Sequence, residues 1–586
     1  MQTVREIKLY DKGSREEEAE VSLKYTVVTR RVAWVLVAMF LVTILLEPIL
    51  QHVSEIRTGL AARRAAATKG ESGTPARILP QVYDVVDLLP SWQSIRQAHT
   101  CREAWMLLPP VKKINAFENA LKENSESARF LLPRAQTALC RIGCGNEKAY
   151  CGRDGWLFYR PEIDYLTEDG FLTPDRLKAR SRSGAEAIQP DPRKAILQFQ
   201  EQLKKRGIQL VVMPVPSKAM VAPGDFTQRY GADHAILQNP SFDKFTAELE
   251  AAGIPVFDIN RALHDSGKGL TYLATDTHWR PETMEAAAQL LRDFITKRSL
   301  LPAAPAAGYK QVVDVVTNLG DIAVMLRLPE EQKLYTRQTV TIHPVLNSRG
   351  EFWQADRKSD VLLLGDSYSN IYSLDAMGWG YGAGFAEQIG FAMQRPVDRI
   401  VRNDAGAFAT RQLLARELAQ GRDRLEGKKL VVWEFAVREL TSGDWKMIDL
   451  KTPEEIAALK AQATHDSSFF VAPAGKTVRV SGIVDSLSFV PRPGSVPYKD
   501  HIFTIHLTNL QGIGTPVEGT QAVVFMWDMR DSKLTPAAKH REGDKLVLNL
   551  HAWADVSGKY GGINQSLPDN DDLMSQEPNW GEEGEL

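Results

Sequence analysis

The stretch Asp360-Val-Leu-Leu-Leu-Gly-Asp-Ser-Tyr-Ser369 decides the fold class of this chain. Its apolar run, Val361 to Leu364, is typical of a strand that is buried on both faces of a sheet. The run stops at Gly365-Asp366-Ser367, a turn that places a serine hydroxyl just past the carboxyl end of the strand. Ligands bind at that edge in open α/β sheets. Ser367 is therefore either a nucleophile or the N-cap of the helix that follows.

Apolar runs of strand length alternate with helical patterns on both sides of this stretch. The alternation predicts an α/β domain over residues 151–455, in which a parallel sheet carries helices on both faces. The expected strands cover residues 155–159, 208–213, 254–258, 361–364, 397–401 and 430–435, and the expected helices cover residues 193–206, 241–252, 281–299 and 406–419.

The composition is that of an ordinary globular protein. The chain has 586 residues, which is too long for one hydrophobic core and favours two or three domains. Hydrophobic residues make up 44% of it and charged residues 25%. The formal net charge is -2, and no basic face suggests binding to nucleic acid.

The N-terminal region predicts one membrane-spanning helix. A helix over residues 32–46 would be about 22 Å long, and extending it to Leu50 gives about 28 Å, close to the roughly 30 Å hydrocarbon core. A signal peptide is one alternative, but a long charged tail precedes the run and no small-x-small cleavage site follows promptly. A buried core helix is another, which the adjacent Arg30-Arg31 pair disfavours.

Basic residues suggest how this anchor is oriented. Lysine and arginine in the tail 1–31 favour a cytoplasmic tail, although Arg57, Arg63 and Arg64 on the other side oppose this. We expect a cytoplasmic tail over 1–31, an anchor over 32–50 and the bulk of the chain outside the cytoplasm, where disulfides are permitted.

Residues 51–150 are expected to form a helical connecting region that contains every cysteine except the last. Cys101, Cys140, Cys144 and Cys151 fit no zinc module, and no histidine lies between the last three. One or two disulfides is the better interpretation, and the sequence does not choose among the three possible pairings.

A second chemical cluster precedes the serine, at Thr275-Asp-Thr-His-Trp279. Asp276 and His278 are two residues apart, so in an extended segment their side chains leave the same face. A carboxylate beside a histidine can hold the ring in one tautomer and stabilise the imidazolium. Together with Ser367, the pair would supply a nucleophile, a base and an orienting group. The alternative is that His278 only caps the helix that starts at Pro281.

Four motifs together resemble the alginate O-acetylation family of AlgJ and AlgX. They are Gly365-Asp-Ser-Tyr-Ser369, Asp276-Thr-His-Trp279, Gly155-Trp-Leu-Phe158 and Pro214-Val-Pro-Ser-Lys218. The resemblance covers about residues 140–440. Ordinary SGNH esterases carry the Gly-Asp-Ser block first and the Asp/His block last. Here the order is reversed, as in the AlgJ/AlgX group. The chain departs from that group in its charged N-terminal tail and its C-terminal domain.

The resemblance implies an SGNH-like three-layer sandwich and an O-acetyltransferase activity. It implies acetyl transfer in the periplasm to hydroxyls of an exopolysaccharide, with Ser367 as nucleophile, His278 as base and Asp276 as orienting residue. It also implies a membrane-bound O-acyltransferase that supplies the acetyl groups, and we expect neither a cofactor nor a metal. The alternatives are an acetylesterase of the same fold and a non-catalytic glycan-binding assembly component.

Five further residues are candidates for contacts with the substrate. Asn403 is expected either to donate to the oxyanion or to cap a helix. Tyr368, Trp379 and Tyr381 lie close in sequence to the serine and could face sugar rings, although packing is expected for at least one of them. Lys218, at the carboxyl end of a strand, could meet an acidic sugar, or it could simply be solvated.

Residues 465–586 are expected to form a separate β domain, a small barrel (OB-like among the options) or a sandwich. Apolar or alternating runs between glycine and proline turns carry this prediction. The domain could bind glycan through Trp527, Trp553 and Tyr560, dock a partner protein, or only stabilise the enzyme. We expect its acidic tail, residues 569–586, to be mobile.

Overall fold

The computed structural model divides the chain into two compact units, residues 1–135 and residues 136–586. It describes residues 30–69, 125–181, 188–230, 237–265, 271–403, 406–462, 468–491, 498–567 and 576–584, with a few single residues between these ranges.

The described part of the first unit is dominated by the helix α2 (Arg30–Lys69). It contains the expected anchor at 32–50, but the side chains of residues 43–48 lie outside the described residues. Within the described part of the chain, no helix is long and apolar enough to cross a membrane. Residues 1–29, and most of the connecting region between 70 and 124, also lie outside the described residues.

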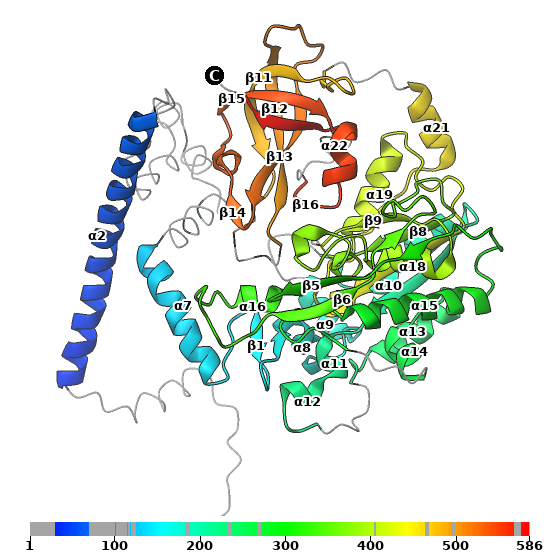
Figure 1. The fold of residues 1–586 in the computed structure, drawn as a ribbon, viewed down its shortest axis with the longest axis horizontal. Coiled ribbons are helices and arrows are strands. Elements are labelled where there is room, and N and C mark those ends of the chain that lie inside the picture. Colours follow the sequence, from blue (N-terminus) through cyan, green and yellow to red (C-terminus); the bar gives the residue numbers. More distant parts are fainter. Residues whose placement is uncertain are drawn as a thin grey trace, which may run out of the picture. The chain divides into compact units, whose positions relative to one another are not determined.

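The second unit contains the predicted parallel sheet (Figure 1). Its strands lie in the order β3 (Gln209–Val215), β10 (Leu430–Ala436), β8 (Val361–Gly365) and β9 (Asp398–Val401), and every neighbouring pair is parallel. Residues 254–258 contribute only a single bridge, between Val256 and Val212. Leu157–Tyr159 forms the strand β2, which pairs with β1 (Ala149–Cys151) outside the parallel sheet.

Helices cover both faces of the sheet, as predicted for three layers (Figure 1). Successive side chains of β3 point to opposite faces of the sheet and pack in two separate hydrophobic cores. Val211 lies in one core and Val212 in the other. The alternation follows from the pleat of a strand. One face carries α14 (Ile259–Asp265), α15 (Pro281–Lys297) and α18 (Phe385–Met393), and the other carries α10 (Pro192–Lys204), α13 (Phe242–Ala251) and α19 (Ala409–Ala419).

The C-terminal β domain is a barrel. β12 (His501–Gly512) pairs with both β11 (Val478–Leu487) and β13 (Ala522–Arg530), and β17 (Asn579–Glu583) joins β13 to β15 (Lys545–Ala552). Since β15 also pairs with β11, the ring closes and leaves no open edge among these strands.

The expectation of a mobile acidic tail is wrong for residues 579–583, which form β17. Trp580 is 2% exposed and packs in edge contact with Trp527 at 5.5 Å between ring centroids. Burying one large aromatic side chain outweighs the solvation that the acidic neighbours favour.

The expected disulfide among Cys140, Cys144 and Cys151 is not formed, and Cys101 lies outside the described residues. Cys151 instead lies beside Tyr335, with 3.2 Å between its Sγ and the hydroxyl. Burial raises the pKa of the Cys151 thiol to about 11. The spacing of cysteines in sequence carries no information on side-chain geometry, which decides whether a bridge can form.

Candidate active site

The predicted serine turn follows β8. α17 (Ser367–Asn370) begins with Ser367, which is 6% exposed. Asp366 is the N-cap, because its Oδ1 accepts a hydrogen bond from the Tyr368 N–H at 2.8 Å. Its Oδ2 accepts another from the Ala436 N–H at 2.8 Å, which ties the turn to β10. The capping alternative for Ser367 is therefore wrong, and the helix start leaves its hydroxyl available.

Glu434, on the neighbouring strand β10, also holds this turn through hydrogen bonds. Its Oε2 accepts from the Asp366 N–H at 2.9 Å and from the Ser369 hydroxyl at 2.6 Å. Burial, followed by the charge of Asp366, raises the pKa of Glu434 well above its usual range. Gly365 is required here, since a Cβ would lie 2.4 Å from the Ser369 Oγ and 2.9 Å from Glu434. The Glu434 carboxyl group thus ties the serine turn to β10.

Asp276 and His278 form the pair that their spacing predicts. The His278 Nδ1 lies 2.6 Å from the Asp276 Oδ1, and both residues are almost fully buried. The other oxygen of Asp276 accepts from the Trp379 indole N–H at 2.8 Å and from the Asp321 N–H at 3.0 Å. Arg280, not His278, is the N-cap of α15, so the capping alternative for His278 is also wrong.

The pKa values of this pair move in opposite directions. Burial opposes ionisation of Asp276, but its hydrogen bond to His278 and the charge of that ring hold the pKa of Asp276 at about 2. Burial alone would lower the pKa of His278, yet the hydrogen bond and charge of Asp276 raise it above its ordinary value. The pair therefore favours a carboxylate beside a ring that accepts a proton readily.

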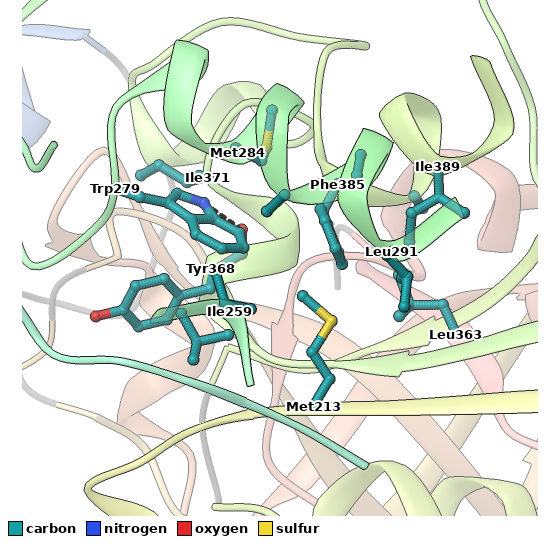
Figure 2. Close-up of a cluster of buried hydrophobic side chains, with 14 of the residues drawn as sticks. Met213, Ile259, Trp279, Met284, Leu291, Leu363, Tyr368, Ile371, Phe385 and Ile389 are labelled. Atoms are coloured by element: carbon teal, nitrogen blue, oxygen red, sulfur yellow. Dashed lines mark hydrogen bonds between the residues drawn. The ribbon is translucent and has the colours of Figure 1, made fainter. Parts of the chain in front are cut away.

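The outer nitrogen of this ring, Nε2, is buried and has no hydrogen-bond partner among the described residues. The His278 ring packs against the Tyr368 ring, with 4.8 Å between their centroids, and Tyr368 directly follows Ser367. The Trp279 indole N–H donates to the Tyr368 carbonyl at 3.2 Å (Figure 2). These contacts bring the histidine loop and the serine turn together, and a buried unpaired nitrogen is costly unless a reacting group uses it.

Asp321, in α16 (Asp321–Met325), is a member of the site that sequence reasoning missed. Its carboxylate accepts from the Thr277 N–H and hydroxyl, both at 2.7 Å, so it fixes the loop between Asp276 and His278. Burial, followed by the charge of Asp276, raises the pKa of Asp321 to about 6. Gly320 before it has a φ of +97°, where a Cβ would lie 2.5 Å from the Thr275 carbonyl oxygen.

Asp276, His278 and Asp321 could also hold a metal ion, since one ligand atom of each lies within 4.8 Å of the others. Their oxygens, however, already accept hydrogen bonds from the His278 ring, the Trp379 indole and the donors of Thr277. A metal would have to displace these donors, so the donor set fits a proton relay better than a metal centre.

Lys218 does not lie where a substrate could meet it. It is fully buried, and its Nζ donates to the carbonyls of Leu157 and Ala274 at 2.8 and 3.1 Å. Burial lowers the pKa of Lys218 to about 8. Both expectations for this residue are wrong, because its side chain turns inward and joins β2 to the histidine loop.

Two of the three aromatic candidates also face inward. Tyr368 and Trp379 are fully buried, while Tyr381 is 46% exposed. The Tyr368 hydroxyl lies 3.1 Å from both the Thr277 carbonyl and Glu162, and Glu162 in turn pairs with Arg438 at 3.3 Å. Tyr368 and Trp379 thus position the pair Asp276–His278. Tyr381 is the exposed one of the three, and its ring packs against Phe352.

Asn403 follows β9 at the same edge of the sheet. Its Oδ1 accepts from the Asn370 amide at 2.8 Å, and Asn370 ends α17. Its Nδ2 is buried without a hydrogen-bond partner among the described residues. The amide is therefore oriented by α17 and has a donor left over.

These features define a class. A serine at the carboxyl end of a central parallel strand, a buried Asp–His pair and an asparagine after the neighbouring strand are those of an SGNH hydrolase-like domain. Residues 149–437 match the family model described as SGNH hydrolase-like domain, acetyltransferase AlgX. The domain formed by these residues belongs to that family.

Curated relatives share this domain. The chain is 27% identical over 328 residues to the probable alginate O-acetylase AlgJ of Pseudomonas putida, covering 54% of this chain and 76% of the relative. It is 27% identical over 336 residues to the protein of the same name from Pseudomonas aeruginosa, covering 55% and 77%.

Solved structures with a similar fold include the O-acetyltransferase domain of P. putida AlgJ and AlgX of P. aeruginosa. The first has a TM-score of 0.39 at 23% identity and covers 54% of this chain and 99% of that chain. The second has a TM-score of 0.36 at 16% identity and covers 69% and 91%.

Proposed function

We propose that this protein is an O-acetyltransferase that moves acetyl groups to hydroxyls of an exopolysaccharide through an acetyl-serine at Ser367. The observation that carries the proposal is the His278 ring, which has its Nδ1 on Asp276 and a buried, unpaired Nε2 beside the serine turn. The relatives are named as probable alginate O-acetylases, which supports acetyl as the transferred group and makes alginate the first polymer to test.

In this mechanism His278 acts first as a base. A serine hydroxyl is a weak nucleophile until a base removes its proton. The Ser367 Oγ attacks the acetyl carbonyl carbon while its proton passes to the His278 Nε2, and Asp276 stabilises the imidazolium. The donor's alkoxide takes that proton and leaves, so that an acetyl ester remains on Ser367.

The tetrahedral intermediate needs donors for its oxyanion. The Ser367 N–H and the Asn403 Nδ2 are the two groups that we assign to this task. In the second half of the cycle His278 takes the proton of a sugar hydroxyl and the sugar oxygen attacks the acetyl carbonyl carbon. The bond from that carbon to the Ser367 Oγ then breaks, and Oγ takes the proton back from His278. Transfer to the sugar is faster than hydrolysis only if the sugar hydroxyl is held next to the acetyl-serine ester and water is kept away from it.

We place the catalytic domain in the periplasm, with residues 32–50 as a single-pass inner-membrane anchor and residues 1–31 in the cytoplasm. Support comes from the apolar run of 32–46 next to Arg30-Arg31. The acetyl group would come from a membrane-bound O-acyltransferase, because a periplasmic serine has no access to cytoplasmic acetyl donors.

The test is an acetyl-transfer assay on the full chain in detergent. The protein is incubated with 4-nitrophenyl acetate, with and without a mannuronate oligomer, and both free acetate and acetylated oligomer are quantified. Acetylated oligomer supports the transferase. Free acetate at the same rate with and without oligomer would instead identify an esterase. No turnover of the donor in either case would leave a non-catalytic component.

The pH dependence follows from His278. Its neutral form is the base, so kcat/KM for 4-nitrophenyl acetate should rise with pH. Because the pKa of His278 is raised, the midpoint should lie above the ordinary value of 6.5. Stability has the opposite sign: the raised pKa stabilises the fold fully below 6.5, and this contribution is lost as the pH rises through the folded-state pKa. Rates measured over about pH 5 to 9 check this, and a midpoint at or below 6.5 would contradict it.

A further inference from the structure

A buried carboxyl group beside the candidate site has no part in the proposed mechanism. Glu162 lies in α8 (Arg160–Thr167), which directly follows β2, and it is 1% exposed. One of its oxygens, Oε2, is buried without a hydrogen-bond partner among the described residues. Burial raises the pKa of Glu162, although the positive charges of Arg438 and Lys218 lower it. A buried carboxyl group with incomplete hydrogen bonds costs stability, and groups with shifted pKa values are concentrated in active sites.

The other oxygen, Oε1, connects Glu162 to the histidine loop. It accepts a hydrogen bond from the Tyr368 hydroxyl at 3.1 Å, and the same hydroxyl lies 3.1 Å from the Thr277 carbonyl oxygen. That carbonyl belongs to the peptide bond that joins Thr277 to His278. The Thr277 N–H is already bound by Asp321 at 2.7 Å. Tyr368 therefore contacts the backbone of this loop on the side that Asp321 leaves open, while its ring packs against the His278 ring.

Glu162 is itself held by Arg438, which lies just past the end of β10. The Arg438 Nη1 lies 3.3 Å from the Glu162 Oε1, and the guanidinium lies 5.9 Å from the centre of the Tyr368 ring. A single carboxyl oxygen thus joins α8, the end of β10 and the start of α17, which carries Tyr368. Hydrogen bonds of this kind fix a side chain more firmly when the acceptor is itself held by a charge.

We propose that Glu162 is a positioning residue for His278, which it holds through the Tyr368 hydroxyl and the Thr277 carbonyl. It would keep the buried Nε2 of His278 beside the serine turn while the ring gains and loses a proton. Misplacing a reacting group by about 1 Å can cost about 100-fold in rate. The inference rests on the proposed function for the reaction that it affects, but the contacts of His278 are tested without that reaction.

The first test compares kcat/KM for 4-nitrophenyl acetate among variants of the full chain in detergent. Glu162→Leu removes the hydrogen bonds of the carboxyl group and should lower kcat/KM by about 10- to 100-fold. Glu162→Gln keeps an oxygen acceptor in the same place and should retain most of the activity. Tyr368→Phe keeps the ring against His278 but loses the hydroxyl, so we expect a loss similar to that of Glu162→Leu.

The double variant Glu162→Leu/Tyr368→Phe shows whether Glu162 acts through Tyr368. Losses at independent positions multiply, whereas two members of one hydrogen-bond network share a loss. The double variant should therefore lie within about twofold of Tyr368→Phe. A loss equal to the product of the two single losses would overturn the proposal, and so would wild-type activity in a folded Glu162→Leu.

Tyr165→Phe is the matched control, because Tyr165 is a fully buried tyrosine of the same helix. Its hydroxyl donates to the Gln238 side chain at 2.5 Å and not to a group of the site. The change should lower the melting temperature but leave kcat/KM as in the wild type. An equal loss of kcat/KM in Tyr165→Phe would mean that weakening α8 is sufficient, and the role of Glu162 would fall.

Glu162→Leu leaves Arg438 without its partner, which can prevent folding. In that case Glu162→Leu/Arg438→Met replaces it, since a buried pair can be exchanged for apolar residues at little cost. The comparison with and without Tyr368→Phe is then made on this background. Losses that multiply there would again overturn the proposal.

A spectroscopic measurement on His278 gives a result that does not depend on turnover. Histidine is labelled with nitrogen-15, and the His278 signal is identified by its absence in His278→Gln. Glu162→Leu and Tyr368→Phe should both shift this signal, and Tyr165→Phe should not. An unchanged signal in the first two would overturn the inference. If the wild-type protein turns over no donor but the signal shifts as expected, the proposed function fails while the positioning role stands.

Discussion

Ser367→Ala should lower the turnover of 4-nitrophenyl acetate by about 10⁴- to 10⁶-fold, because the variant lacks the hydroxyl that is proposed to carry the acetyl ester. Acetylation of the oligomer should fall with it. The fold should be kept, since Asp366 caps α17 and Glu434 holds the turn without using the Ser367 side chain. Initial rates, together with the melting temperature, check both statements.

The matched control is Ser369→Ala, the same change two residues further along the turn. Ser369 donates to Glu434 at 2.6 Å, so its loss should reduce stability and disturb the turn, yet leave turnover measurable. If the Ser369 variant were as inactive as the Ser367 variant, the role of nucleophile would not be assigned.

Covalent labelling gives an independent check. A sulfonyl fluoride should modify Ser367, and peptide mass mapping locates the adduct. The chain contains another serine beside a histidine, Ser566, whose Oγ lies 3.1 Å from the Nε2 of His501. His501 and its partner Asp528 are fully buried in the barrel, so no adduct is expected at Ser566. Labelling at Ser566 alone would move the candidate site to the barrel.

Asp276→Asn should lower kcat by about 10⁴-fold while leaving the fold in place. The asparagine can still accept from His278, but it favours the wrong tautomer of the ring and cannot stabilise the imidazolium. The pKa of His278 should fall, since the carboxylate that raises it is gone. The pH–rate profile should accordingly shift to lower pH, a change that a merely structural defect would not produce.

Asp321→Asn is the comparison for that variant. It removes a buried carboxylate from the same loop, but one that binds Thr277 and lies 4.0 Å from the His278 Nδ1. We expect a smaller loss of kcat than in Asp276→Asn. An equal loss would mean that Asp321, rather than Asp276, is the main partner of the histidine.

Local pattern was enough to predict the four strands of the parallel sheet and the pairing of Asp276 with His278, although two further expected strands, at 155–159 and 254–258, are not part of that sheet. The pairing of Asp276 with His278 follows from the alternation of side chains along an extended segment, because residues two apart point to the same face. The position of Ser367 follows from an apolar run that ends at a turn. Neither prediction needs contacts between distant parts of the chain.

The sequence does not reveal contacts between residues far apart in the chain, nor the direction in which a side chain points. Asp321 reaches Asp276 across 45 residues, through a loop that no local pattern marks. Lys218 lies at the predicted end of its strand, but its direction is set by the carbonyls of Leu157 and Ala274. Trp379 joins Asp276 across 103 residues in the same way. An aromatic residue near the nucleophile can face a sugar or the core, and only packing decides.

The position of β10 has a consequence for how the protein folds. It is the last strand of the parallel sheet along the chain, yet it lies between β3 and β8 at the centre. β8 and β9 pair directly, but β3 joins them only through β10, so the four-stranded sheet is not complete until residues 430–436 have been made. Contacts over such separations form slowly. Glu434, which fixes the serine turn, arrives with that strand. We therefore expect the turn that carries Ser367 to become fixed only once β10 has been synthesised.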